Sequence, residues 1–238
     1  MTPSRRTALT AGLLYLLTVA TSIPALILKE PVLTDPGLIE SGGAITLAWA
    51  GALEVVMAAA CVGTAVVLLP VLRRTSEVAG LGFLAARTIE AGLVMLGVIA
   101  MLALPALDAA ARAGAPGDAL RAVHDGAFLL GPGLIPAANG LLLGVALYRA
   151  RLVPRVLPVL AFVGAPLLLA SAVATMFGAV DQVSGLAGAA ALPIAAWEIG
   201  LGLWLTLKGF SAPRNPAAMT GPAGPAPRRR PHPPRPAG

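Results

Sequence analysis

Charge is scarce in this sequence. Only 12% of its 238 residues are charged, whereas 57% are hydrophobic and the mean hydropathy is +0.84. A typical soluble domain carries about 25% charged residues, and a chain with half that share cannot cover its surface with charge. The composition therefore excludes an ordinary soluble domain and predicts one integral membrane domain.

Cysteine and histidine are almost absent too. Cys61 is the only cysteine, so no disulfide can form within the chain, and we interpret it as a small packing residue. The two histidines, His124 and His232, are far apart and have no cysteine partners, which argues against a zinc site. Metalloprotease, serine hydrolase, phosphate-loop and dinucleotide-binding motifs are missing as well. We therefore predict no catalytic residue, metal or cofactor, and we do not expect an enzyme.

Long apolar runs are what the sequence has in abundance. A helix needs about 20 predominantly apolar residues to cross a hydrocarbon core about 30 Å thick. Counting such runs predicts an all-α, polytopic bundle of six transmembrane helices over residues 1–210. The predicted spans are residues 8–28, 43–69, 78–106, 127–147, 156–180 and 188–208. Gly131, Pro132, Gly133 and Pro136 make the fourth span the least regular.

Positive charge is distributed unevenly between the two sides of these spans. One side has only Lys29, Arg112 and Arg121. The other side has Arg5, Arg6, Arg73, Arg74, Arg149, Arg151, Arg155, Lys208 and the arginines of the C-terminal segment. Because cytoplasmic loops retain Lys and Arg, both termini are predicted to face the cytoplasm of a bacterial inner membrane. The net charge of +6 thus reports topology, and we do not expect a nucleic-acid partner.

Residues 211–238 change composition abruptly to Pro, Gly, Ala and Arg, with little to bury. This composition predicts a disordered cytoplasmic tail. Its Arg228, Arg229, Arg230 and Arg235 could bind anionic lipids of the inner leaflet, at about 1 kcal/mol per basic residue. A solvated tail that only reinforces the orientation is the alternative.

Four charged residues and one amide lie near the middle of the predicted spans. They are Glu54, Arg87, Glu90, Asn139 and Glu198. At 1.5 Å per residue, each lies roughly 12–18 Å from the nearer span end, which predicts one layer near the membrane midplane. Arg87 and Glu90 are three residues apart and share a helix face. A central charge costs about 2.5–3.5 kcal/mol on insertion scales, so we expect these groups to turn inward and pair.

The number of carboxyls in this predicted cluster exceeds the number of cations. With three glutamates against Arg87, we predict that at least one carboxyl holds a proton at neutral pH. A proton relay and a static hydrogen-bonded brace are both compatible with this pattern. Gly140 and Gly144, next to Asn139, form a G-x-x-x-G motif and predict close packing of the fourth helix against a neighbour.

Four segments carry a resemblance to a known family. They are RRTALTAGLLYL (5–16), RTIEAG (87–92), LLLGVALYRARLVPRVL (141–157) and WEIGLGLWLTLKGF (197–210). The chain resembles, up to Phe210, the bacterial membrane proteins grouped as domain of unknown function 4386. The resemblance implies a multi-helix membrane protein without an assigned activity.

Several polar residues match the family by position, and two positions depart from its pattern. The matching residues are Arg87, Glu90, Glu198, Trp204 and Lys208. Histidine is frequent in the family where this chain has Asn139, and glycine where it has Pro158. An amide that does not titrate weakens the case for a proton pathway at this position.

Three classes of function are compatible with the sequence. The leading one is an accessory or binding protein whose bundle contacts a lipid or a membrane-protein partner. The second is a small transporter of protons or solutes that uses the predicted polar cluster. The third, an intramembrane enzyme, would need a nucleophile such as Ser171, Thr175 or Ser184, none of which has a histidine nearby in sequence.

Overall fold

The computed structural model describes residues 3–211 and contains only helices within that range. The elements are α1 (Pro3–Thr34), η1 (Pro36–Ile39), α2 (Gly43–Arg73), α3 (Glu77–Ala103), η2 (Leu104–Ala106), α4 (Ala109–Ala113), α5 (Ala115–Leu130), α6 (Ile135–Ala150), α7 (Val156–Met176) and α8 (Gly185–Leu207). The predicted tail beyond Ser211, with its four lipid-binding candidates Arg228, Arg229, Arg230 and Arg235, lies outside the described residues.

Six helical segments within the described range are long and apolar enough to cross a membrane, which confirms the predicted fold class. The fourth segment, Ala115–Ala150, consists of α5 and α6. The helix breaks between them at Gly131–Leu134, as the run of glycine and proline predicted. The first span is longer than predicted, because α1 continues past residue 28 to Thr34. The fifth is shorter, since α7 ends at Met176 rather than at residue 180.

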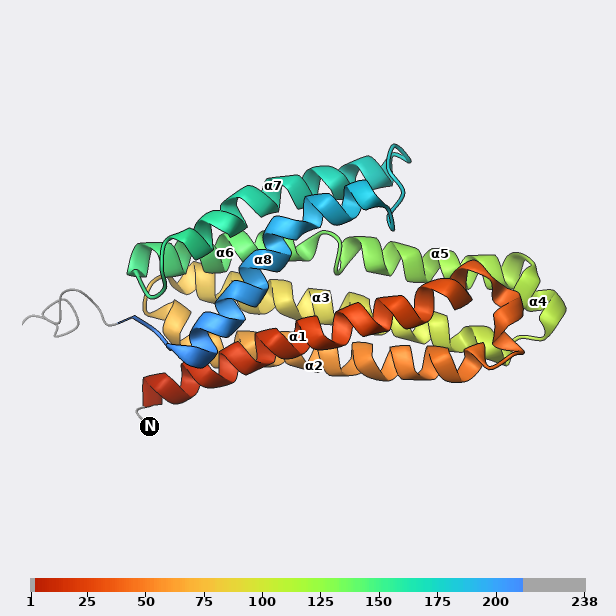
Figure 1. Cartoon of the computed structure of the whole chain (residues 1–238), viewed down its shortest axis with the longest axis horizontal. Coiled ribbons are helices and arrows are strands. Elements are labelled where there is room, and N and C mark those ends of the chain that lie inside the picture. The colour runs from red at the N-terminus through yellow and green to blue at the C-terminus, as the bar shows by residue number, and fades with distance from the viewer. Residues whose placement is uncertain (1–2, 212–238) are drawn as a thin grey trace, which may run out of the picture.

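The long helices run side by side, with α1, α2, α3 and the α5–α6 pair along the long axis (Figure 1). The hairpin of α7 and α8 lies over α6 and leaves the α4 end of the bundle uncovered (Figure 1). The start of α1 and the end of α8 lie at the same end of the bundle (Figure 1). The basic residues at the ends of α1, α2, α6 and α8 therefore share one end, which we call the basic end; the end with α4 is the outer end.

Helix α8 crosses α1 in close contact near the basic end. A Cβ on Gly12 of α1 would lie only 2.7 Å from the Gly202 carbonyl oxygen of α8, so only glycine fits here. Arg5 reinforces the crossing by donating hydrogen bonds to the carbonyl oxygens of Leu205 (2.8 Å) and Thr206 (2.6 Å) in the last turn of α8. A cation at a helix C-terminus is also favoured by the helix dipole.

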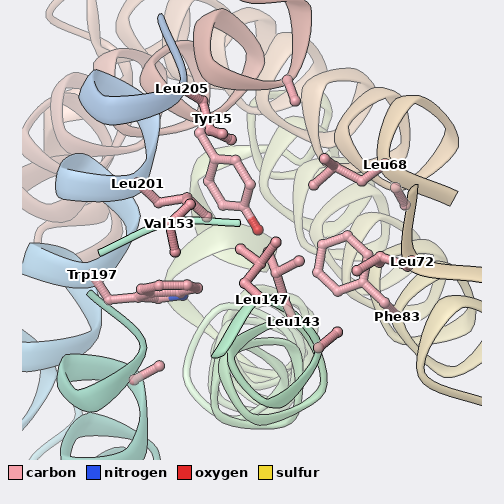
Figure 2. Close-up of a cluster of buried hydrophobic side chains, with 14 of the residues drawn as sticks. Tyr15, Leu68, Leu72, Phe83, Leu143, Leu147, Val153, Trp197, Leu201 and Leu205 are labelled. Carbon is pink, nitrogen blue, oxygen red and sulfur yellow. The ribbon is translucent and has the colours of Figure 1, made fainter. Parts of the chain in front are cut away.

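A packed core fills the bundle toward the basic end. Figure 2 shows Tyr15 of α1 with its hydroxyl directed toward the centre, between Trp197 of α8 and Phe83 of α3. Leucines of α2, α6 and α8 surround these rings (Figure 2). Gly140 and Gly144 let α6 approach α7, where Ala161 and Phe162 face them, which confirms the packing predicted from the G-x-x-x-G motif.

Candidate functional site

Arg87 of α3 joins three helices through its hydrogen bonds. Its Nη1 donates to Glu90 Oε2 on the same helix at 3.0 Å, and its Nη2 donates to Glu198 Oε1 of α8 at 3.0 Å. Asn139 Nδ2 of α6 donates to the same Glu90 oxygen at 2.7 Å. The structure thus brings together four of the five predicted residues, and we call Arg87, Glu90, Asn139 and Glu198 the Arg87 cluster.

These four residues meet because their helices place them at a similar depth. Each lies roughly 13–20 Å from the basic end of its helix at 1.5 Å per residue. The spacing of three residues puts Arg87 and Glu90 on one face of α3, and that face is buried. Trp197, which is buried in the packed core, fixes the rotation of α8 and so aims Glu198 toward Arg87.

Three further side chains contact Arg87, and the sequence did not identify their roles. The guanidinium carbon lies 5.1 Å from the ring centroid of Tyr15 and 5.8 Å from that of Phe83. Nη1 also lies 3.5 Å from Cys61 Sγ, so Cys61 is more than the packing residue it was interpreted to be. Cation–π contacts of this kind contribute about 2 kcal/mol or more when desolvated. Aromatic rings on two helices thus help to hold the guanidinium inside the bundle.

Glu54 does not join the Arg87 cluster, which corrects the prediction of one five-residue layer. Its carboxylate forms a buried ion pair with Lys29 Nζ of α1. Glu54 lies about 28 Å from the basic end of α2 at 1.5 Å per residue, roughly two turns nearer the outer end than the cluster. Lys29 also lies 4.5 Å from the ring centroid of Phe128 on α5.

Lys29 was assigned to an outer loop, and this assignment was wrong. The side chain is buried within α1 and is the partner that the sequence analysis missed. The sequence carries little signal, because α1 is almost uniformly apolar and the helical spacing of Ala11, Tyr15, Thr18 and Ala25 with Lys29 becomes a buried stripe only in the structure. A lysine on such a stripe points into the bundle.

A cavity of about 250 Å³ reaches the Arg87 cluster. Arg87, Glu90 and Glu198 form its polar wall, and the rest of the lining is mostly apolar and comes from α1, α2 and α5–α8. Two adjoining cavities, of about 310 and 210 Å³, share Leu26 and Phe128 with it. The larger one includes the exposed residues Asp125 and Asp181 at the outer end. We call these three cavities together the hollow region; they extend from the outer end to the cluster, and Leu26 and Phe128 form walls that they share.

The Arg87 cluster is not saturated by its own hydrogen bonds. Only Glu198 is partly open to the cavity, with 19% of its side chain exposed, against 7% for Glu90 and 2% for Arg87. Arg87 Nε and Asn139 Oδ1 are buried without a hydrogen-bond partner. A purely structural brace would satisfy these atoms internally, because an unpaired buried polar atom costs about 1–3 kcal/mol.

Metal-ligating side chains do not converge in the part of the chain that the structure describes. His124 Nδ1 lies 3.0 Å from Asp125 Oδ1, and its Nε2 is buried without a partner. Ser171, Thr175 and Ser184 all line the cavity of about 210 Å³, whose lining contains neither a histidine nor a carboxylate to activate them. The expectation that the protein has no catalytic residue, metal or cofactor remains a prediction.

Six apolar helices around a buried ionic cluster define a multi-pass membrane protein. The profile of the family described as a domain of unknown function (DUF4386) matches residues 10–209, which confirms the resemblance seen in the sequence. The chain belongs to this family. Searches of curated proteins and of solved structures found no match.

Proposed function

We propose that the protein is an accessory or binding protein of the bacterial cytoplasmic membrane, with both termini in the cytoplasm, and that it binds a small molecule beside the Arg87 cluster. The observation that carries this proposal is the cavity of about 250 Å³ whose polar wall is formed by Arg87, Glu90 and Glu198. Apolar pockets with a few convergent polar groups are the usual form of small-molecule sites.

The state of the cluster favours binding over a static brace. Glu198 is partly exposed to the cavity, and only its Oε1 accepts a hydrogen bond. Arg87 Nε has no partner either. Glu198 therefore offers an unused hydrogen-bond acceptor to a molecule in the cavity, and the buried, unpaired Nε of Arg87 shows that the cluster is not fully satisfied as a brace.

Transport of protons or small solutes is the second candidate. The break between α5 and α6 favours it, because Pro132 within the break and Pro136 at the start of α6 both line the cavity. Broken helices at binding sites near the midplane are a common feature of transporters. Transport requires net flux across the membrane, whereas binding alone does not.

We propose that the protein is not an enzyme, since the hydroxyls of Ser171, Thr175 and Ser184 have no general base beside them. Binding of anionic inner-leaflet lipids by the C-terminal arginines and contact with a membrane-protein partner belong to the same proposal. An intramembrane enzyme is the least supported class.

The native cysteine provides a test of the binding site. Cys61 lines the cavity and is the only thiol in the chain. In lipid nanodiscs, we expect a small uncharged maleimide to label Cys61 at least tenfold faster than a thiol placed by Ala65→Cys in a Cys61→Ser chain. Ala65 lies one turn further along α2 in the packed core. A small molecule bound in the cavity should slow the labelling of Cys61 further.

A panel of small aromatic compounds of positive, zero and negative charge supplies the ligands. The binding site would be supported if any member of the panel protects Cys61 from labelling. This protection should be lost in Glu198→Gln and kept in the exposed control Glu77→Gln. Equal, slow labelling of both thiols with no protection by any compound would show a dry brace and overturn the proposal.

A further inference from the structure

The ion pairs of the bundle leave one carboxylate in excess. Lys29 balances Glu54, and Arg87 balances only one of its two partners, Glu90 and Glu198. Arginine keeps its proton inside proteins, so the fully ionised Arg87 cluster carries one net negative charge. An uncompensated charge at this depth is costly. The cluster therefore becomes neutral by holding one proton or one monovalent cation.

Glu198 is the carboxyl that a cation would reach from the cavity. Glu90 accepts hydrogen bonds from both Arg87 and Asn139, and it is nearly enclosed. Glu198 accepts one hydrogen bond from Arg87, and the structure gives its second oxygen no partner. Its side chain is partly exposed and lines the cavity.

The walls of the cavity indicate what kind of cation fits. Met57, Phe128, Leu168 and Ile194 line it and offer no oxygen ligands. Besides the carboxylates, only the hydroxyls of Thr18 and Ser22 bring side-chain oxygens to its lining, which are too few to replace the water shell of a metal ion. The described residues also contain no group of three metal-ligating side chains. An organic cation with an apolar body would instead bury that body against these walls. Its charge would lie beside Glu198, and aromatic rings such as Phe128 also attract cations.

We propose that the ligand of this cavity is a lipophilic organic monocation, which displaces a proton from Glu198. This inference rests on the proposed binding function and names its ligand class. As the cation enters, the O–H bond of the protonated Glu198 carboxyl breaks, and the proton leaves through the hollow region toward the outer end. The resulting carboxylate pairs with the cation, so the cluster stays neutral in both states.

The other titratable and charged groups around Glu198 lie on three neighbouring helices. Tyr15 comes from α1, Cys61 from α2, and Arg87 and Glu90 from α3. The lining contributed by α5, α6 and α7 is uncharged. Of the two carboxyls in this group, Glu198 has the more exposed side chain, 19% against 7% for Glu90.

A matched pair of probes tests the charge requirement. Benzyltrimethylammonium and neopentylbenzene have nearly the same shape, but only the first is charged, and it has no ionisable proton of its own. In nanodiscs of the full chain, we expect the cation to slow labelling of Cys61 at a concentration at least tenfold lower than its neutral analogue does. In weak buffer with a pH-sensitive dye, about one proton should be released per cation bound.

Glu198→Gln should lower cation affinity at least tenfold and abolish proton release, whereas Glu77→Gln should behave like the parent and Glu198→Asp should retain release. If Glu198→Gln does not fold, the comparison of the two probes and the number of protons released by the parent chain still test the cation inference. Equal protection by both probes, or cation binding without proton release, would overturn the cation inference and leave the binding site intact. No protection by either probe or by the wider panel would overturn both.

Discussion

The buried pair of Lys29 and Glu54 shows how one residue can alter the interpretation of a whole span. The apolar count ended the first span at residue 28, because a lysine usually marks the membrane surface. In the structure Lys29 lies inside α1, where Glu54 neutralises it and the ring of Phe128 lies 4.5 Å away. Removing one member of a buried pair costs more than removing both, because it leaves a charge without a partner.

We expect Lys29→Met to destabilise the protein by about 3–5 kcal/mol, since it leaves the Glu54 carboxylate unpaired in a buried position. Adding Glu54→Leu to Lys29→Met should recover most of that loss. Reversible unfolding in mixed micelles would measure the free energy of unfolding of the single and the double variant. The exposed pair of Arg73 and Glu77 is the control, and Arg73→Met should cost less than about 1 kcal/mol. Additive losses in the double variant would contradict the pairing.

At the scale of elements, the crossing of α1 and α8 depends on the absence of a side chain. Gly12 and Gly202 let the two backbones touch, and Arg5 binds the last carbonyls of α8 beside them. In lipid the hydrophobic effect does not drive helices together, and small residues of this kind let two helices associate through close van der Waals packing. This contact brings Trp197 and Glu198 to their places beside α3.

Gly12→Ala should destabilise the bundle by about 1–3 kcal/mol, because the added methyl group would overlap the backbone of α8. Gly92→Ala on α3 is the matched control, since a Cβ at Gly92 would meet no atom within 4 Å. That substitution should be neutral or slightly stabilising, given the better helix propensity of alanine. Thermal unfolding in one detergent would compare them. Equal melting temperatures for the two variants would refute the close crossing.

Local signals in the sequence predicted the elements, and partners distant in sequence decided the site. Apolar runs and the Gly-Pro-Gly break act within one helix, so the six spans and the interrupted fourth one could be predicted. The pair of Arg87 and Glu90 followed from helical spacing in the same way. Which helices adjoin depends on packing between distant segments. The spacing of residues along the sequence therefore could not predict that Tyr15 contacts Arg87 or that Glu54 lies apart from the cluster.

At the scale of the whole molecule, the hollow region and the packed core occupy opposite ends. The three cavities of the hollow region lie between the Arg87 cluster and the outer end. Toward the basic end, the space is filled by Tyr15, Phe83, Trp197 and the leucines around them (Figure 2). This arrangement provides access to the cluster from one side. Passage to the other side would require the core to rearrange.

Proteoliposomes with an internal pH dye would test whether passage occurs. If the protein only binds its ligand, the parent, Glu90→Gln and Glu198→Gln should give the same proton flux under a pH gradient as empty liposomes, within experimental error. The packed core supplies the physical reason, because it offers no polar path. Flux well above that of empty liposomes, removed by Glu198→Gln at equal folded yield, would establish the transport alternative.

The crossing of α1 and α8 also determines how the bundle can deform. Arg5, Gly12 and Gly202 hold α1 and α8 together near the basic end. A change in the crossing angle between the two helices would therefore hardly move this contact. Gly185, at the other end of α8, lies about 25 Å from the crossing at 1.5 Å per residue. A tilt of about 5° would therefore carry the rim of the hollow by about 2 Å. If α8 tilted about this crossing, the rim of the hollow would move while the contact with α1 stayed in place.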